Sequence, residues 1–313
     1  MVGRPSPYCP AMTYRVEQTT DPAAFLALAG EHLAADPVLS TVVSTVLERA
    51  VGDPEVPEHP RWWAAVLDGE QVVGVGMRTA PFRPYPLYLL PMPGEAARAL
   101  GRHLVATGED VAHANGARAS VEVVLGVLAE ARGGGARVLE HDRLWEATRV
   151  VAPTGVPGSS RRATEADLDL VTSWCQAFMP EADRQAGRPP REGEGEHLDR
   201  EWAADRVGRG LVWLWEDDGE VVHLTAHSAP SFRVSRIGPV YTPAEHRGHG
   251  YAAALVAEVT DRILGAGARA CLFTDVDNPV SNGVYARIGY EPQTEMVRME
   301  LVEAGALTTP GPA

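Results

Sequence analysis

The sequence predicts an α/β protein made of two similar halves joined by a short linker. Residues 62–80 and 211–229 carry the same pattern: a β-rich run, an Asp-Gly turn and a second β-rich run. Asp-Gly between such runs is a strong hairpin signal, because glycine adopts the positive φ that the turn needs. Two hairpins can look alike by chance, but these lie about half a chain apart and a similar order of elements surrounds both. The repeated order indicates a duplicated domain.

Apolar periodicity and capping residues define the elements of the first half. Asp21 is expected to cap its first helix. The expected elements are helices over 22–34 and 37–49, the hairpin over 62–80 with a strand over 87–90, helices over 95–106 and 117–131, and a strand-like segment over 138–150.

The second half follows the same order. Thr164-Glu-Ala-Asp167 is a variant capping box that opens a helix through about Phe178, and residues 181–197, rich in Glu, Arg, Gly and Pro, are expected to form a loop. The remaining expected elements are a helix over 198–207, the hairpin over 211–229, a strand over 232–242, a helix over 250–264, a buried strand over 270–274, a helix over 278–288 and a final strand pair or ribbon over 290–302.

The boundary between the halves is predicted from composition. Residues 151–160 are rich in Pro, Gly and Ser, as linkers are. We therefore expect one domain over residues 1–152, a linker over 153–160, a second domain over 161–303 and a disordered tail over 304–313.

Composition limits the classes of partner. The 313 residues carry a formal charge of −14, which disfavours binding to nucleic acid and attracts cations instead. The sequence shows neither a signal peptide nor an apolar run long enough to span a membrane, so we expect a cytoplasmic protein without a membrane partner. Its three cysteines are far apart, and His246 and His249 have no carboxylate spaced to complete a site, so no metal is expected.

An anion site is predicted where the strand over 232–242 leads into the next helix. The connecting segment contains Arg247-Gly-His-Gly-Tyr-Ala252. Its glycines let backbone amides approach a ligand, and the first amides of a helix lack intrahelical partners and lie at the positive end of the helix dipole. Such an arrangement suits a pyrophosphate.

Two motifs in this half resemble those of the GNAT N-acetyltransferases. The first is Arg/Gln-x-x-Gly-x-Gly/Ala, matched by Arg247, Gly250 and Ala252. The second is a strand–helix segment, Asn-x-x-Ser/Ala-x-x-x-Tyr-x-x-x-Gly-Phe/Tyr. Its positions are occupied by Asn278, Ser281, Tyr285, Gly289 and Tyr290. The resemblance covers about residues 158–302, whereas the first half resembles the same fold only in its order of elements.

The resemblance implies a tandem GNAT-like fold and a place for each part of an acyl-CoA, most simply acetyl-CoA as cosubstrate. The family fold is a mixed sheet with flanking helices in which two neighbouring central strands splay apart around the coenzyme. The residues implied in binding are Val240, Tyr241 and Thr242 for the pantetheine amides, Arg247, Gly248, His249, Gly250, Tyr251 and Ala252 for the pyrophosphate, and Asn278, Ser281 and Asn282 beside the pantetheine arm.

The implied reaction is attack of an amine on the thioester. An alkylamine has a pKa near ~10, so a base must remove a proton, and the departing thiolate needs an acid. The resemblance implies Tyr285 as the acid and places Glu181 near the acceptor cleft, as a base. Asp275, at the end of the central strand, is a second option for the base, and each of the two carboxylates can equally be a solvated surface group. His223 and His227 would share one strand face and could relay protons if that face lines the cleft.

The first half departs from the motif. Its corresponding segment, Leu90-Pro-Met-Pro-Gly-Glu-Ala-Ala97, has one glycine, two prolines without amide protons, and a negative charge at Glu95. We expect this half not to bind coenzyme A. For the whole chain we expect an N-acetyltransferase acting on a small-molecule or peptide amine. The alternatives are a non-catalytic acyl-CoA-binding regulator and a transferase of a longer acyl group.

Overall fold

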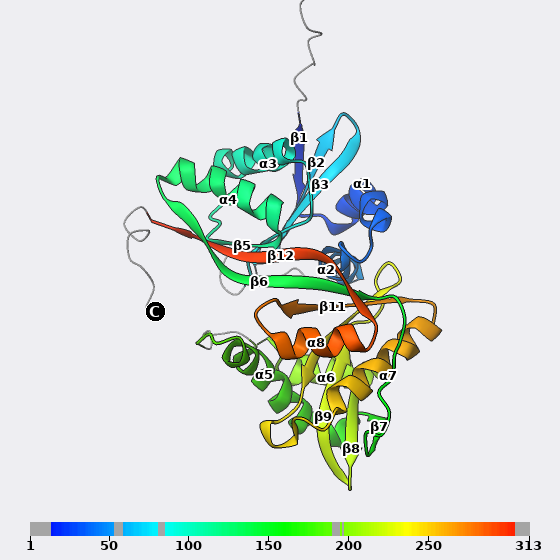
Figure 1. Ribbon diagram of the computed structural model, residues 1–313. Helices are drawn as coiled ribbons and strands as arrows, with labels where there is room; N and C mark the ends of the chain where they lie inside the picture. Colours follow the sequence, from blue (N-terminus) through cyan, green and yellow to red (C-terminus); the bar gives the residue numbers. More distant parts are fainter. Residues whose placement is uncertain (1–13, 53–58, 81–84, 190–194, 196, 304–313) are drawn as a thin grey trace, which may run out of the picture.

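The computed structural model describes residues 14–52, 59–80, 85–189, 195 and 197–303. Within these residues, twelve strands form one mixed sheet with helices on both of its faces (Figure 1). The α/β class and the mixed sheet that the sequence predicts are therefore confirmed.

The strands divide evenly between the two halves. Those of the first half are β1 (Arg15–Thr19), β2 (Trp62–Asp68), β3 (Gln71–Arg78), β4 (Leu87–Leu89), β5 (His113–Ala117) and β6 (Gly135–Ala147). Those of the second half are β7 (Ser159–Arg162), β8 (Val212–Asp217), β9 (Glu220–His227), β10 (Val234–Tyr241), β11 (Arg269–Asp275) and β12 (Tyr290–Val302).

The described helices also divide evenly. The first half contributes α1 (Pro22–Ala35), α2 (Thr41–Gly52), α3 (Gly94–Ala106) and α4 (Arg118–Arg132). The second half contributes α5 (Leu168–Gln185), α6 (Arg200–Gly208), α7 (Tyr251–Gly265) and α8 (Pro279–Arg287), with 3₁₀ turns η1 (Glu165–Asp167) and η2 (Ala244–His246).

The last strand of each half is exchanged with the other half. The order across the sheet is β1-β2-β3-β4-β5-β12-β6-β11-β10-β9-β8-β7. Strand β12 therefore lies between β5 and β6, and β6 lies between β12 and β11. The two exchanged strands pair antiparallel along their whole length, from Tyr290 opposite Ala147 to Val302 opposite Gly135 (Figure 1). The predicted final ribbon is thus one strand whose partners both come from the first half.

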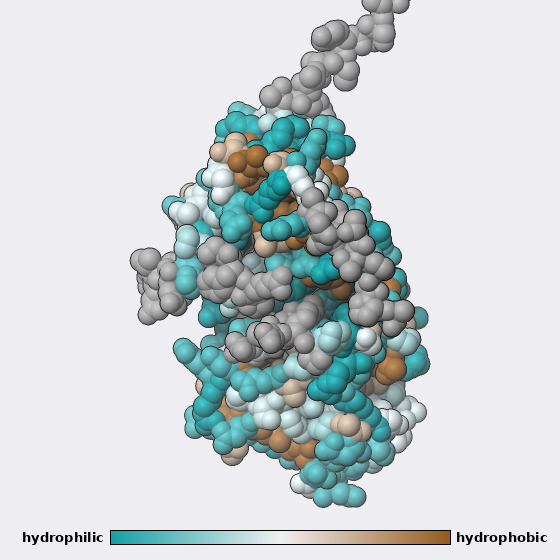
Figure 2. Space-filling model, turned by 90° about the vertical axis from the view of Figure 1, so that its left-hand side faces the viewer, coloured by the Kyte–Doolittle hydropathy of each residue, from teal (hydrophilic) through white to brown (hydrophobic). Residues whose placement is uncertain are grey.

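Alternating side chains place an apolar core on each face of the sheet. In β2, Trp62 packs with α3 and α4, whereas its neighbour Trp63 packs with α1 and α2. In β8, Trp213 faces α7 and Leu214 faces α5 and α6. Each fully buried side chain of this kind contributes about 1.5–3 kcal/mol. The face shown in Figure 2 is mainly hydrophilic, with hydrophobic atoms confined to small patches.

Most of the predicted elements are present, and their caps explain where they begin. The Asp21 carboxylate accepts hydrogen bonds from the amides of Ala23 and Ala24, and the capping box of Thr164 and Asp167 is formed in both directions. None of the helices within the described part of the chain is long and apolar enough to cross a membrane.

Some of the expected boundaries are wrong. Helix α5 continues through Pro180 to Gln185, so the expected loop begins five residues too early. Beyond the proline the helix still packs on the protein, because Asp183 is buried at helical spacing from the buried Val171 and Cys175. The sequence pattern does not predict the short strands β1, β5 and β7, because each is defined by its pairing with a neighbour rather than by its own pattern.

Candidate active site

Strands β10 and β11 separate in the middle of the second half. They pair in parallel over only three residues each, Val234–Arg236 of β10 and Arg269–Cys271 of β11. Beyond this point β10 has an irregularity between Ile237 and Val240 but remains paired with β9, while β11 remains paired with β6 as far as Asp275. The facing edges of residues 237–241 and 272–275 therefore diverge. This is the splayed pair of strands that the resemblance implies.

The chain leaves β10 through a glycine loop that ends at the beginning of α7. Gly248 and Gly250 have φ values of +85° and +88°, a conformation that side chains with a Cβ rarely adopt. Nothing lies within 4 Å of the position that a Cβ on Gly248 would take. The first helical hydrogen bond runs from the Ala254 amide to the Gly250 carbonyl, at 3.0 Å, so the amides of residues 251–253 have no intrahelical acceptor. The end of this exposed loop can bind an anion.

Arg247 is held between the end of β10 and helix α5. Its Nε donates to the Thr242 carbonyl at 3.0 Å, and its Nη1 lies 2.8 Å from the Glu181 carboxylate. Glu181 also contacts Arg184 on its own helix. The proposed base therefore lies beside the glycine loop, where its carboxylate pairs with the guanidinium that the motif assigns to the pyrophosphate.

His223 connects β9 to the residue that follows β10. Its Nδ1 is hydrogen-bonded to the Thr242 hydroxyl at 2.7 Å and its Nε2 to the Thr225 hydroxyl at 3.0 Å. The ring is fully buried, and this burial lowers the pKa of His223 to about 3. The imidazole is therefore neutral at physiological pH and both nitrogens are engaged. His223 fixes Thr242 in place and is poorly suited to relay protons.

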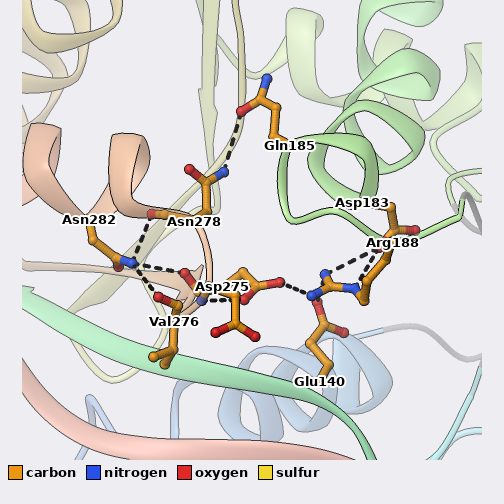
Figure 3. Close-up of polar contacts among 9 residues, drawn as sticks. Glu140, Asp183, Gln185, Arg188, Asp275, Val276, Asn278 and Asn282 are labelled. Atoms are coloured by element: carbon orange, nitrogen blue, oxygen red, sulfur yellow. Dashed lines mark hydrogen bonds and ion pairs between the residues drawn. The ribbon is translucent and has the colours of Figure 1, made fainter. Parts of the chain in front are cut away.

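Asn278 of the second motif and Asn282, which follows Ser281, build the turn between β11 and α8 (Figure 3). Asn278 caps α8, because its Oδ1 accepts from the Ser281 amide at 3.1 Å, and its Nδ2 donates to Gln185 at 3.3 Å. The Nδ2 of Asn282 donates to three backbone carbonyls at 2.8–3.1 Å, and its Oδ1 accepts from Thr274 at 2.6 Å. The motif thereby sets the position of the helix that carries Tyr285.

Tyr285 lies on the face of α8 that packs on the core. It is 9% exposed and packs edge-on against Tyr290, with ring centroids 5.9 Å apart. Burial raises the pKa of Tyr285 well above its usual value, so the hydroxyl keeps its proton at neutral pH. A protonated hydroxyl of this kind can donate a hydrogen bond or a proton.

Several polar residues at this site were not identified from the sequence. Arg188, after α5, forms ion pairs with Glu140, Asp183 and Asp275 (Figure 3). No motif marks Glu140, because it comes from β6 of the first half and reaches the site only through the strand exchange. Within the part of the chain that is described, no group of three or more His, Cys, Asp or Glu side chains could hold a metal ion.

The comparisons with known proteins agree with this geometry. Residues 219–299 match the family model described as FR47-like protein, which is related to the GNAT acetyltransferases. No curated protein matches the sequence.

Solved structures share the fold over most of the chain. A GNAT-family acetyltransferase from Colwellia psychrerythraea is 11% identical, with a TM-score of 0.57, and the match covers 92% of this chain and 100% of that one. A GCN5-related N-acetyltransferase from Sphaerobacter thermophilus is 19% identical, with a TM-score of 0.58 and coverage of 94% and 96%. A Drosophila protein is 12% identical, with a TM-score of 0.60 and coverage of 92% and 98%. The chain has the fold of the GNAT acetyltransferases, and residues 219–299 match a family model that is related to them.

Proposed function

We propose that this protein is an N-acetyltransferase that transfers an acetyl group from acetyl-CoA to an amine by direct attack. The observation that carries the proposal is the separation of β10 from β11 directly before a glycine loop whose amides point out of the start of α7. A strand edge without a partner accommodates a pantetheine arm, and unpaired amides accommodate its diphosphate.

Each segment of the coenzyme has a proposed contact. The backbone of Val240, Tyr241 and Thr242 would pair with the pantetheine amides, because this edge of β10 has left β11. The amides from Gly248 to Ala252, together with Arg247, would hold the diphosphate. Asn278, Ser281 and Asn282 would line the other side of the arm. Arg247 must then exchange its contact with Glu181 for the phosphate oxygens.

The chemistry requires three proton transfers, two from the nitrogen and one to the thiolate. A base removes one proton from the ammonium, and the neutral amine attacks the thioester carbon, whose oxygen a backbone N–H near Val240 can stabilise. The C–N bond forms and the C–S bond breaks, while Tyr285 donates its proton to the departing thiolate. The acetylated nitrogen then gives its second proton to the Tyr285 phenolate, which yields the neutral amide and restores the acid. Glu181 is the proposed base, since its carboxylate pairs with Arg247 after β10, and Asp275, at the end of β11, is the second candidate.

Calorimetry and a thiol-release assay with the intact protein test the proposal. We expect one molecule of acetyl-CoA to bind per chain and an amine panel to contain acceptors that release free thiol. Absence of any binding of coenzyme A or its thioesters would overturn the proposal. Binding without thiol release from any amine would instead identify an acyl-CoA-binding regulator, and faster turnover with longer acyl-CoAs would identify a transferase of a longer acyl group.

A further inference from the structure

A pocket of about 280 Å³ lies at the opposite end of the second half from the glycine loop. Its lining includes Ser235, near the start of β10, and Ile263 and Ala266, at the end of α7, whereas the glycine loop precedes the first turn of α7. Helix α7 has 15 residues, so its two ends are about 20 Å apart. A water molecule occupies roughly 30 Å³ in the liquid, so this pocket can hold a ligand of about ten non-hydrogen atoms.

Strand pairing places the lining side chains of three strands on one face of the sheet. Arg162 of β7 lies opposite Trp213 of β8, and Trp213 lies opposite Thr225 of β9. His227 comes two residues after Thr225 and therefore lies on the same face. Because Trp213 packs with α7, this is the face that α7 covers. Strand β7 is the last of the sheet, so Arg162 is exposed at the rim of the pocket (Figure 1).

Guanidinium groups at the pocket outnumber the carboxylates beside them. Arg162, Arg209 and Arg262 belong to its lining. Arg209 is 3.5 Å from the carboxylate of Asp205, and Arg262 is 2.6 Å from that of Glu258. Arg162 has no carboxylate partner in the part of the chain that the structure describes. These groups therefore leave a positive charge in excess.

Two of the guanidiniums share one aromatic ring. The Cζ atom of Arg262 lies 4.4 Å from the centroid of the Trp213 ring, and the Cζ atom of Arg162 lies 5.2 Å from it. Both distances are within the range of a cation–π contact, so the ring holds two like charges near one another. Like charges repel, and an anion beside them adds two attractions that offset this repulsion.

Two groups behind the lining also lie among positive charges. Arg206 donates a hydrogen bond to the His227 carbonyl at 2.9 Å. Burial lowers the pKa of His227, and the charges of Arg206 and Arg162 lower it further. Burial also lowers the pKa of Arg206, with a further contribution from the charge of Arg236. His227 is therefore neutral at pH 7, and a negative charge on a ligand would be favourable here.

The end of α7 carries a partial negative charge, which its neighbours offset. Carbonyl groups in the last turn of a helix attract cations. The Nη2 of Arg233 donates to the Gly267 carbonyl at 2.8 Å, and Arg262 lies in the last turn itself. The helix dipole therefore does not cancel the excess of guanidiniums.

Much of the remaining lining is apolar. It includes Leu211, Trp213, Val259 and Ile263. An inorganic anion would leave these side chains in contact with water, whereas an apolar group attached to the anion would cover them. A carboxylate suits the anionic end, because its two oxygens match the donors of a guanidinium.

We propose that this pocket binds a small carboxylate with an apolar body, with the carboxylate beside Arg162 and Arg262 and the body against Trp213. The site does not depend on the proposed acetyltransferase activity, since it lies at the other end of α7. The small excess of positive charge favours a monoanion. The chain as a whole is strongly acidic, so a general attraction for anions would not account for such binding.

Titration calorimetry of the intact protein with matched probes tests the proposal. Phenylacetate carries both features, phenylacetamide lacks the charge, and acetate lacks the apolar body. We expect the Kd of phenylacetate to be at least about tenfold lower than that of either analogue, as the loss of one charge contact or of the apolar contact predicts. The proposal is overturned if phenylacetate does not bind at millimolar concentration, or if phenylacetamide, acetate or inorganic phosphate binds as tightly.

Two substitutions assign the binding to this pocket. Arg162→Gln should raise the Kd of phenylacetate about tenfold and leave that of phenylacetamide unchanged, because only a charge is lost. Ala266→Trp, at an exposed residue of the lining, should fill the pocket and prevent the binding of both probes. Circular dichroism checks that both variants are folded.

Two control variants exclude other sites. Arg98→Gln removes an exposed guanidinium from α3 of the first half, and Gly250→Ala alters the glycine loop. Both should leave the Kd of phenylacetate unchanged. A Kd that rises in Gly250→Ala but not in Arg162→Gln would place the anion at the glycine loop and overturn the proposal.

Discussion

Strands β4 and β5 of the first half stay together where β10 and β11 of the second half part. All three residues of β4 pair with β5, from Leu87 opposite Ala114 to Leu89 opposite Gly116. A Cβ on Gly116 would lie 2.1 Å from the Leu89 carbonyl oxygen, so the two backbones are in direct contact. The first half therefore lacks the opening that separates β10 from β11 in the second half.

The connections from β4 to α3 and from β10 to α7 also differ. In the first half, α3 begins at Gly94, directly after Pro93, and Glu95 adds a negative charge to its first turn. In the second half, residues 244–250 separate Pro243 from α7 and form the glycine loop. The longer connection leaves the amides at the start of α7 exposed, in a position where an anion can bind.

A third difference lies beneath the connections. In the first hairpin Gly74 leaves room for Met92, whose side chain fills the space after β4. In the second hairpin the corresponding position is His223, which is hydrogen-bonded to Thr242 after β10. The first half thus has an apolar contact, made by Met92, where the second half has a hydrogen bond from His223 to Thr242. We expect only the second half to bind coenzyme A.

The largest effect is expected at Tyr285, which acts only in the open half. Tyr285→Phe should lower kcat about 100-fold, since a positioned general acid contributes this much or more, while the Kd for acetyl-CoA stays the same. Tyr290→Phe is the control: it removes a buried hydroxyl that is hydrogen-bonded to Thr260, 2.6 Å away, without touching the chemistry. Full turnover of Tyr285→Phe, with chemistry rate-limiting, would remove the acid assignment.

The next largest effect is expected in the first half, where Met92 packs against Gly74. A Cβ on Gly74 would lie 2.6 Å from the Met92 Cβ, so Gly74→Ala should lower the free energy of unfolding by about 1–3 kcal/mol through overpacking. Urea denaturation measures this change. Because the clash is with the Met92 Cβ, which a change of rotamer cannot move, Met92→Gly in the same chain should restore part of the lost stability. An unchanged urea midpoint for Gly74→Ala would show that the space is not tightly filled.

A smaller effect compares the two helix starts directly. Gly250→Ala forces a Cβ into a left-handed conformation and brings it 3.2 Å from Val156, so the Kd for coenzyme A should rise about tenfold, equivalent to about 1–2 kcal/mol. Gly94→Ala, at the start of α3, has open space and an ordinary φ. It should leave the Kd unchanged, as titration calorimetry can measure. A similar loss in both variants would refute the difference between the helix starts.

The smallest effect is expected at His223, which is hydrogen-bonded to Thr242. Burial keeps His223 neutral in the folded protein, with its pKa lowered from 6.5 to about 3, whereas the unfolded chain takes up a proton below about pH 6.5. Stability from this source is therefore complete above pH 6.5 and is lost as pH falls, by about 1 kcal/mol on going to pH 5.5. Burial also lowers the pKa values of His227 and His32, so the difference in stability between wild type and His223→Asn isolates the contribution of His223. Parallel urea stabilities of the two proteins at pH 7 and 5.5 would contradict the buried, neutral state.

The features that could be read from the sequence are local. Both hairpins, the caps at Asp21 and Thr164, and the glycine loop before α7 depend on residues within a few positions of one another. Asp-Gly turns, side-chain caps and positive-φ glycines act at this range, so the residues themselves identify them. The two motifs around Arg247 and Asn278 belong to the same class.

Tertiary structure alone decided which distant segments meet. The exchange of β6 and β12 depends on pairing between residues more than 140 positions apart, which no local pattern encodes. That exchange brings Glu140 to Arg188, and the packing of α5 on the sheet brings Glu181 to Arg247. Strand register and ion pairs of this kind are determined by the whole packed sheet, because a β-strand with a suitable pattern can pair with many partners.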